Sequence, residues 1–116
     1  MRKTLLGVIG LCVAGGCGGH PAPNEQIANS LAAVRGAEEA GAMNVPEAAL
    51  HVKLAQEQIE QAKQLMNHDE NLKAEDRALR ADLDAELALA IAREDTARKK
   101  LDQLEQAQRT AGGEHP

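Results

Sequence analysis

Hydrophobic positions recur at helical spacing over three stretches of this chain, and Gly, Pro and Asn residues separate the stretches. The first stretch predicts a helix over residues 24–40. Asn24 is a suitable N-cap residue, and Gly41 stands where a helix C-terminal glycine is expected. The apolar positions of this helix are Ile27, Leu31, Val34 and Ala37.

The second stretch predicts a helix over 46–66, with Pro46 in its first turn and Glu47 beside its positive end. On a helical wheel its polar residues gather in one sector of about 120°, and apolar residues fill most of the remainder. One neighbouring helix cannot cover so wide a stripe. We therefore expect this helix to be the middle one of three.

The third stretch predicts one long helix over 70–110, since neither Gly nor Pro occurs from Leu72 to Thr110. Asp69 or Asn71 is expected to cap it. A leucine stripe keeps to one face, and we expect it to pack on the second helix, so that Leu83→Asp unfolds the bundle. The stripe contains Leu72, Leu79, Leu83, Leu87, Ala90, Ile91, Ala97, Leu101 and Leu104.

Another face of the same helix carries only alanines, at 74, 78, 81, 85, 88 and 92. The favoured interpretation is that small residues let a neighbouring helix approach closely within the bundle. The alternative is a smooth apolar surface that receives a partner helix. Opposite charges four residues apart should stabilise the helix by a few tenths of a kcal/mol each; the pairs are Asp76/Arg80, Glu94/Arg98 and Asp95/Lys99.

The three predicted helices indicate an all-α fold, which is either an antiparallel helical hairpin or a three-helix bundle with a long C-terminal helix. The third helix, counted as about 38 residues, is about 57 Å long, and the second is about 32 Å long. About 25 Å of the third helix, around Arg93 to Arg109, therefore has no partner within the chain. This part must fray, pair with another copy or meet a different protein, and Leu101 and Leu104 are its candidate interaction face.

Residues 1–16 have the pattern of an export signal. Arg2 and Lys3 precede an uncharged apolar run from Leu5 to Val13, and small residues end it. A run of this length is far short of the ~20 residues that span a bilayer. The sequence therefore predicts a cleaved leader ahead of the helical domain.

Cys17 directly follows the small residues, and Val13-Ala14-Gly15-Gly16-Cys17 resembles the lipobox of bacterial lipoproteins. That resemblance implies cleavage between Gly16 and Cys17 and acylation of Cys17, although Ala14 stands where Leu is usual. The alternative is ordinary cleavage after Gly16, which leaves a soluble periplasmic protein. Because no Asp follows the cysteine, the resemblance favours the outer membrane, facing the periplasm. Residues 17–23 would form a flexible tether, and 111–116 a disordered tail.

The amino-acid composition limits the classes of partner that the chain is expected to bind. The chain has 116 residues, a formal charge of −5 and no Phe, Tyr or Trp. Loss of residues 1–16 removes two of the 13 basic residues and none of the 18 acidic ones, which leaves a charge near −7. Without aromatic platforms or clustered basic residues, nucleic-acid and carbohydrate binding are not indicated. We expect a membrane contact through the lipid, with self-association or an envelope protein as further partner.

No catalytic or metal-binding constellation is evident, and we expect no enzyme activity, cofactor or small-molecule substrate. His20, His51, His68 and His115 share no zinc-binding spacing. His51 is expected to form a surface pair with Glu47, four residues earlier. Ser30, the only serine, lacks the GxSxG context of a hydrolase.

Two segments resemble the domain of unknown function 4398 family, which comprises alanine-rich helical domains of bacterial envelope lipoproteins. They are Val34-Arg35-Gly36-Ala37 to Val45-Pro46-Glu47-Ala48-Ala49-Leu50, with Leu54-Ala55 after it, and Ala81-Asp82-Leu83-Asp84-Ala85-Glu86-Leu87-Ala88. The likeness covers residues 27–92. The Gly-Asp often found before the last helix is replaced here by Asn67-His68-Asp69-Glu70. The family has no established activity, so the resemblance implies no catalytic residues. We expect a non-enzymatic envelope lipoprotein with a structural or protein-interaction role; the alternative is a soluble periplasmic adaptor or chaperone-like protein.

Overall fold

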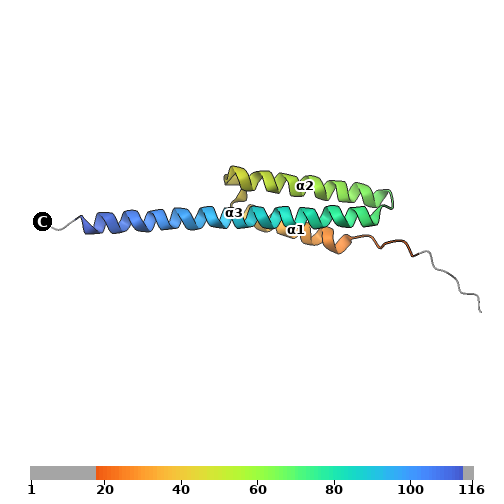
Figure 1. The fold of residues 1–116 in the computed structure, drawn as a ribbon, viewed down its shortest axis with the longest axis horizontal. Coiled ribbons are helices and arrows are strands. Elements are labelled where there is room, and N and C mark those ends of the chain that lie inside the picture. Colours follow the sequence, from red (N-terminus) through yellow and green to blue (C-terminus); the bar gives the residue numbers. More distant parts are fainter. Residues whose placement is uncertain (1–17, 114–116) are drawn as a thin grey trace, which may run out of the picture.

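The computed structural model describes residues 18–113, which fold into three α-helices and one short 3-10 turn (Figure 1). The elements are α1 (Asn24–Glu39), η1 (Ala42–Asn44), α2 (Pro46–Asn67) and α3 (Asn71–Gly112). The described part contains no strand, so the predicted all-α class is confirmed. The bounds agree with the expected ones to within two residues. Ala111 and Gly112, which we assigned to the tail, belong to α3.

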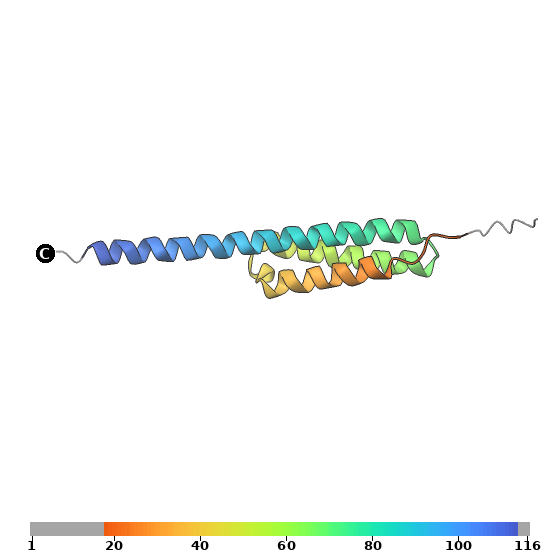
Figure 2. The same cartoon turned by 90° about the horizontal axis from the view of Figure 1, so that it is seen from below.

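The central helix is α3 and not α2, which corrects the expected arrangement. Both α1 and α2 pack mainly against the first half of α3, and their contact with each other is much smaller (Figures 1 and 2). The chain runs along α1, returns along α2 and turns again into α3. Helix α2 is therefore antiparallel to both neighbours, and α1 and α3 run in the same direction.

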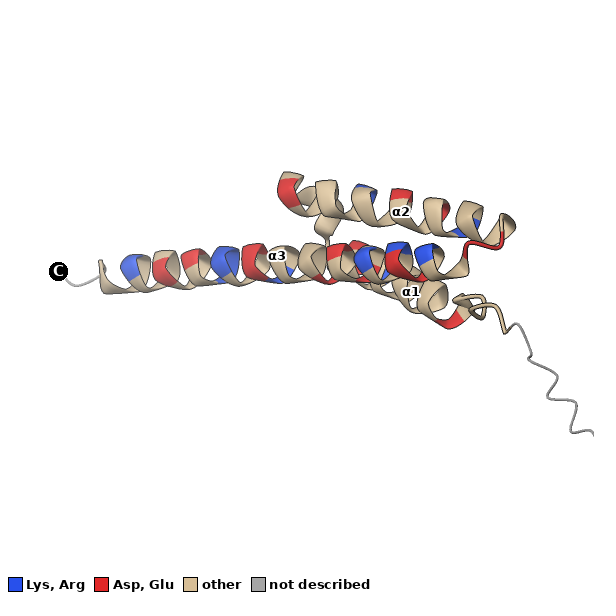
Figure 3. Cartoon of the chain, turned by 45° about the vertical axis from the view of Figure 1, so that its right-hand side comes forward, with Lys and Arg blue, Asp and Glu red and all other residues tan. Residues whose placement is uncertain are grey.

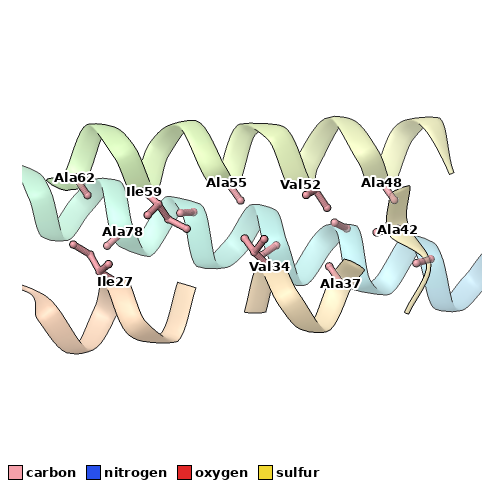
Figure 4. Close-up of a cluster of buried hydrophobic side chains, with 14 of the residues drawn as sticks. Ile27, Val34, Ala37, Ala42, Ala48, Val52, Ala55, Ile59, Ala62 and Ala78 are labelled. Atoms are coloured by element: carbon pink, nitrogen blue, oxygen red, sulfur yellow. The ribbon is translucent and has the colours of Figure 1, made fainter. Parts of the chain in front are cut away.

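The core is built mostly from alanine, and the alanine stripe of α3 faces inward (Figure 4). Buried positions alternate in steps of four and three residues on α2 and α3, the spacing of a heptad seam. On α1 the buried positions follow the same rule, in steps of three and four. The seams consist of Ile27, Ser30, Val34 and Ala37 on α1, Ala48, Val52, Ala55, Ile59 and Ala62 on α2, and Ala74, Ala78, Ala81, Ala85, Ala88 and Ala92 on α3.

Because all the α3 seam residues are alanine, the larger side chains of α1 and α2 fill the spaces between helices. Ile59 and Val52 are the largest apolar side chains that are fully buried. The favoured interpretation of the alanine stripe, close approach within the bundle, is confirmed.

The expectation that the leucine stripe packs on α2 is wrong. Leu72 is 67% exposed and Leu83 66% exposed, and Leu79 is half exposed. The two stripes lie on nearly opposite sides of α3, so only one of them can face the bundle. The alanine stripe keeps a regular heptad over its whole length and the leucine stripe does not, which explains why the alanines form the seam.

The positions at which the helices begin and end are determined by backbone conformation and not by hydrogen bonds from capping side chains. Gly41 has φ +88°, the left-handed region in which glycine ends a helix, as predicted. Pro46 begins α2, also as predicted. The proposed cap residues are wrong, because neither α1 nor α3 has a side-chain cap and Asn24 and Asn71 are already helical.

The turn between α2 and α3 is a Schellman motif formed by Asp69. The Glu70 amide donates to the Leu65 carbonyl at 2.9 Å, and the Asp69 amide donates to the Met66 carbonyl at 3.1 Å. Asp69 has φ +58°, and it is the only described residue other than glycine with a positive φ. An aspartate thus occupies a position that glycine usually takes.

The second half of α3 extends beyond the bundle, as the helix lengths predicted (Figure 2). Every residue from 96 to 113 is exposed, and we call this last part of α3, about 25 Å of helix, the free segment (96–112). The three predicted ion pairs along α3 are present, at 3.0, 2.5 and 2.7 Å. None of the described helices is both long enough and apolar enough to cross a membrane.

Candidate functional site

A small polar cluster joins α2 to α3 on one side of the alanine seam. The Asp84 carboxylate contacts His51 Nδ1 at 2.9 Å and accepts a hydrogen bond of 2.7 Å from Gln58 Nε2. His51 and Asp84 are both about one-fifth exposed. The expected pairing of His51 with Glu47 is replaced by this contact between helices, because the buried alanine seam brings the two backbones together.

The polar cluster consists of one imidazole, one carboxylate and one amide side chain. Gln58 Oε1 is buried without a hydrogen-bond partner. No group of three or more metal-ligating side chains gathers anywhere in residues 18–113. His68 lies in the α2–α3 turn and is exposed, and His115 lies outside the described residues. We interpret the cluster as a polar link that fixes the register of α2 on α3.

Ser30 is fully buried at the α1–α3 contact. Its hydroxyl lies 2.7 Å from the Ala78 carbonyl and 2.8 Å from the Gln26 carbonyl, and its single proton is shared between them. The hydroxyl thus serves helix packing, and among described residues no histidine contacts it.

The segment 18–23 is held against the start of α3. His20 Nε2 contacts the Glu75 carboxylate, and Asn71 Nδ2 donates a hydrogen bond of 2.8 Å to the His20 carbonyl. Pro23 is buried at the start of α1. The segment therefore leaves the bundle at the end opposite to the free segment (Figures 1 and 2). The predicted processing residues, Gly16 and Cys17, lie outside the described residues.

The turn into α3 also carries an exposed ion pair, in which the Lys73 ammonium contacts the Glu70 carboxylate. The hydrogen bond from Lys73 and its positive charge lower the pKa of the Glu70 carboxyl, and His68 adds a smaller effect in the same direction. Because the folded-state pKa is lowered, any stabilisation by this pair is present above the ordinary carboxyl pKa and is lost as the pH falls.

The most conspicuous surface feature is an apolar row along the outer side of α3. We call it the leucine face and define it as Leu72, Leu79, Leu83, Leu87, Leu101 and Leu104. Leu101 and Leu104, the predicted interaction residues, are 56% and 54% exposed. Leu79 and Leu83, beside the bundle, are 50% and 66% exposed. The leucines beside the bundle are therefore as exposed as the leucines beyond it, which shows that α1 and α2 do not cover the first half of the leucine face.

Only Leu101 and Leu104 of the leucine face were predicted from the sequence as interaction residues, because the other leucines were expected to lie in the core. The signal that would have found them is the regular alanine heptad on the opposite side. An open hollow of about 310 Å³ also lies near the α2–α3 turn, lined by Leu65, Leu72, Lys73, Asp76 and Arg77. The leucine face is thus the best candidate for a functional surface in the described part of the chain.

Comparison with known proteins gives a family and no function. The family model described as Domain of unknown function (DUF4398) matches residues 25–104. No curated protein and no solved structure matches the chain. The match spans the three helices as far as Leu104, and with it the whole leucine face. This alanine-cored bundle of three helices therefore belongs to the DUF4398 family of domains of unknown function.

Proposed function

We propose that this protein is a non-enzymatic lipoprotein of the bacterial envelope, held to a membrane by an acylated Cys17, whose helical domain serves as a structural or protein-interaction module. The observation that carries the proposal is the lipobox-like run that ends at Cys17, after a leader of the length and charge of an export signal. More than one acyl chain is needed for stable anchoring, and lipoproteins of this kind carry two or three. We propose the outer membrane as the destination, because Gly18 and not Asp follows the cysteine.

The structure is compatible with such an anchor at the start of the domain. His20 and Pro23 hold the N-terminal segment against the beginning of α3, so the residue after Cys17 lies near one end of an elongated domain. Helix α3 then runs about 63 Å away from that end. The leucine face runs along α3 and would therefore begin near the membrane-anchored end of the domain and extend away from that end.

The absence of enzymatic chemistry is likewise our proposal. It is supported by the use of the polar groups of the described residues in helix packing and ion pairs: Ser30 binds the Ala78 carbonyl, and His51 binds Asp84. A soluble periplasmic adaptor or chaperone-like protein is the second candidate, since the residues before Cys17 also fit ordinary cleavage after Gly16.

Metabolic labelling with an alkyne fatty acid tests the anchor. The intact chain should be labelled and recovered with membranes, and Cys17→Ser should lose the label. Cys12→Ser is the matched control, since it removes the other cysteine, and it should keep the label. A cleaved, unlabelled and soluble wild-type chain would establish the second candidate, and an uncut precursor in the cytoplasm would overturn both.

A further inference from the structure

We infer that the leucine face of α3 binds the leucine face of a second copy, with the two α3 helices antiparallel and centred on Ala90. This inference does not depend on the membrane anchor. It goes beyond the expected role of Leu101 and Leu104 because it assigns the whole length of α3 to the contact and gives it a direction.

The area that a stable interface needs determines how much of α3 must take part in the contact. Helix α3 has 42 residues and is about 63 Å long. With a helix width of about 10 Å, its outer side covers about 600 Å², close to the ~800 Å² per partner of a standard stable interface. The free segment alone covers only about 250 Å², which is too little. A stable contact must therefore include the leucines beside the bundle.

The bundle leaves this contact open. The alanine seam that binds α1 and α2 lies nearly opposite the leucine face, so neither helix obstructs a partner that approaches the leucines. Ala90 and Ala97 lie on the leucine face between its two halves, and both are exposed. Small side chains at the centre allow two helices to approach closely, while leucines at both ends supply the apolar contact.

Charges on one edge of the leucine face indicate the direction. Asp82 and Glu86 lie on this edge beside the first half of the face, and Arg93 and Lys100 lie on the same edge beside the second half. None of these four residues forms an ion pair with any residue from 18 to 113. The edge is thus acidic along one half and basic along the other.

The opposite edge of the face differs, because its charges are already paired along α3. Asp76 binds Arg80 and Glu94 binds Arg98. Figure 3 shows that acidic and basic residues both occur along the whole of α3. Charge complementarity between copies must therefore come from the first edge.

Two antiparallel helices bring equivalent edges together, and parallel helices bring opposite edges together. With Ala90 opposite its own copy, Glu86 lies beside Arg93 of the second copy, and Asp82 lies beside Lys100. Twofold symmetry repeats both pairs, which gives four ion pairs. The same register places Leu79 opposite Leu101. A parallel pair would set this edge against the edge whose charges are already paired.

Cysteine crosslinking of the full chain in intact cells tests both the contact and its direction. Two differently tagged copies are expressed together and treated with a short bis-maleimide. Ala90→Cys should crosslink with itself, and Leu79→Cys should crosslink with Leu101→Cys while neither crosslinks with itself. Leu50→Cys on the exposed side of α2 is the matched control, and the chain without new cysteines gives the background from Cys17. Self-crosslinking of Leu79→Cys would overturn the antiparallel direction, and no crosslink at any position of the leucine face would overturn the contact.

Charge reversal provides a test that does not alter the leucines. In the Ala90→Cys chain, Glu86→Arg should reduce the crosslinked fraction severalfold, because Arg93 of the partner then repels it. Adding Arg93→Glu to the same chain should restore the fraction. Both positions are exposed, so the fold of the monomer is preserved. Failure of the second substitution to restore crosslinking would contradict the predicted register.

Discussion

Enlarging one alanine of the α3 seam should destabilise the bundle far more than the same change on the outside. Ala85 has no exposed surface and lies within the cluster that Val52 and Ile59 complete. Ala85→Leu adds three carbon atoms where the helices already touch, and overpacking of this kind costs about 1–3 kcal/mol or somewhat more. Because α3 contributes nothing larger than alanine to its seam, the backbones must separate. We expect a loss near the upper limit, about 3 kcal/mol.

The matched control is Ala107→Leu, the same substitution on the exposed free segment. Leucine is nearly as good a helix former as alanine, so the free energy of unfolding should change by less than about 0.5 kcal/mol. Urea titration and thermal melting followed by circular dichroism, at one fixed protein concentration, measure both variants. A loss of about 3 kcal/mol corresponds to a fall in Tm of about 15 °C for a domain of this size. Equal melting of Ala85→Leu and the wild type would refute the alanine core.

Further changes test the turns and the polar link, each by urea denaturation. Gly36→Ala should stabilise the bundle by about 0.5–1 kcal/mol, because a methyl group at this helical position meets nothing within 4 Å, whereas Gly41→Ala should destabilise it by about 1 kcal/mol at φ +88°. Asp69→Gly should stabilise by up to about 1 kcal/mol, since glycine adopts the left-handed conformation without strain; unchanged stability would contradict the assigned turn. A double-mutant cycle of Asp84→Ala with His51→Ala should give a coupling of about 1 kcal/mol, and additive effects would show that the 2.9 Å contact contributes nothing.

The sequence predicted the helices well because helical periodicity, Pro46 and Gly41 are local signals. Each of these signals acts within a few residues of the chain, and the helices of the structure begin and end within two residues of the predicted bounds. The length of the free segment followed from simple arithmetic on helix rise.

The core face was harder to predict because hydrophobicity alone favours leucine over alanine. Leu83 contributes more apolar area than Ala85, yet Ala85 is buried and Leu83 is exposed. What decides the packing is the regular heptad shared by three helices and the close approach that small residues permit, and both depend on residues far apart in the sequence. The link between His51 and Asp84 was missed for the same reason, since those residues are 33 positions apart.

The proposed anchor and the inferred pairing together determine how the molecule would lie. In an antiparallel pair, the two segments that precede His20 leave from opposite ends, because each lies at the start of its own α3. Two acylated cysteines would then hold the pair at both ends, so that its long axis lies along the membrane.

The central claim is that α3 turns its alanines inward and its leucines outward, and thiol reactivity measures this most directly. Ala85→Cys and Leu83→Cys are modified under native conditions over a range of protein concentrations, and each thiol is followed separately by peptide mass spectrometry. We predict that Ala85→Cys is protected at every concentration, and that Leu83→Cys reacts rapidly in dilute protein and more slowly as copies associate. A protected Leu83→Cys in dilute protein, together with a reactive Ala85→Cys, would contradict the account.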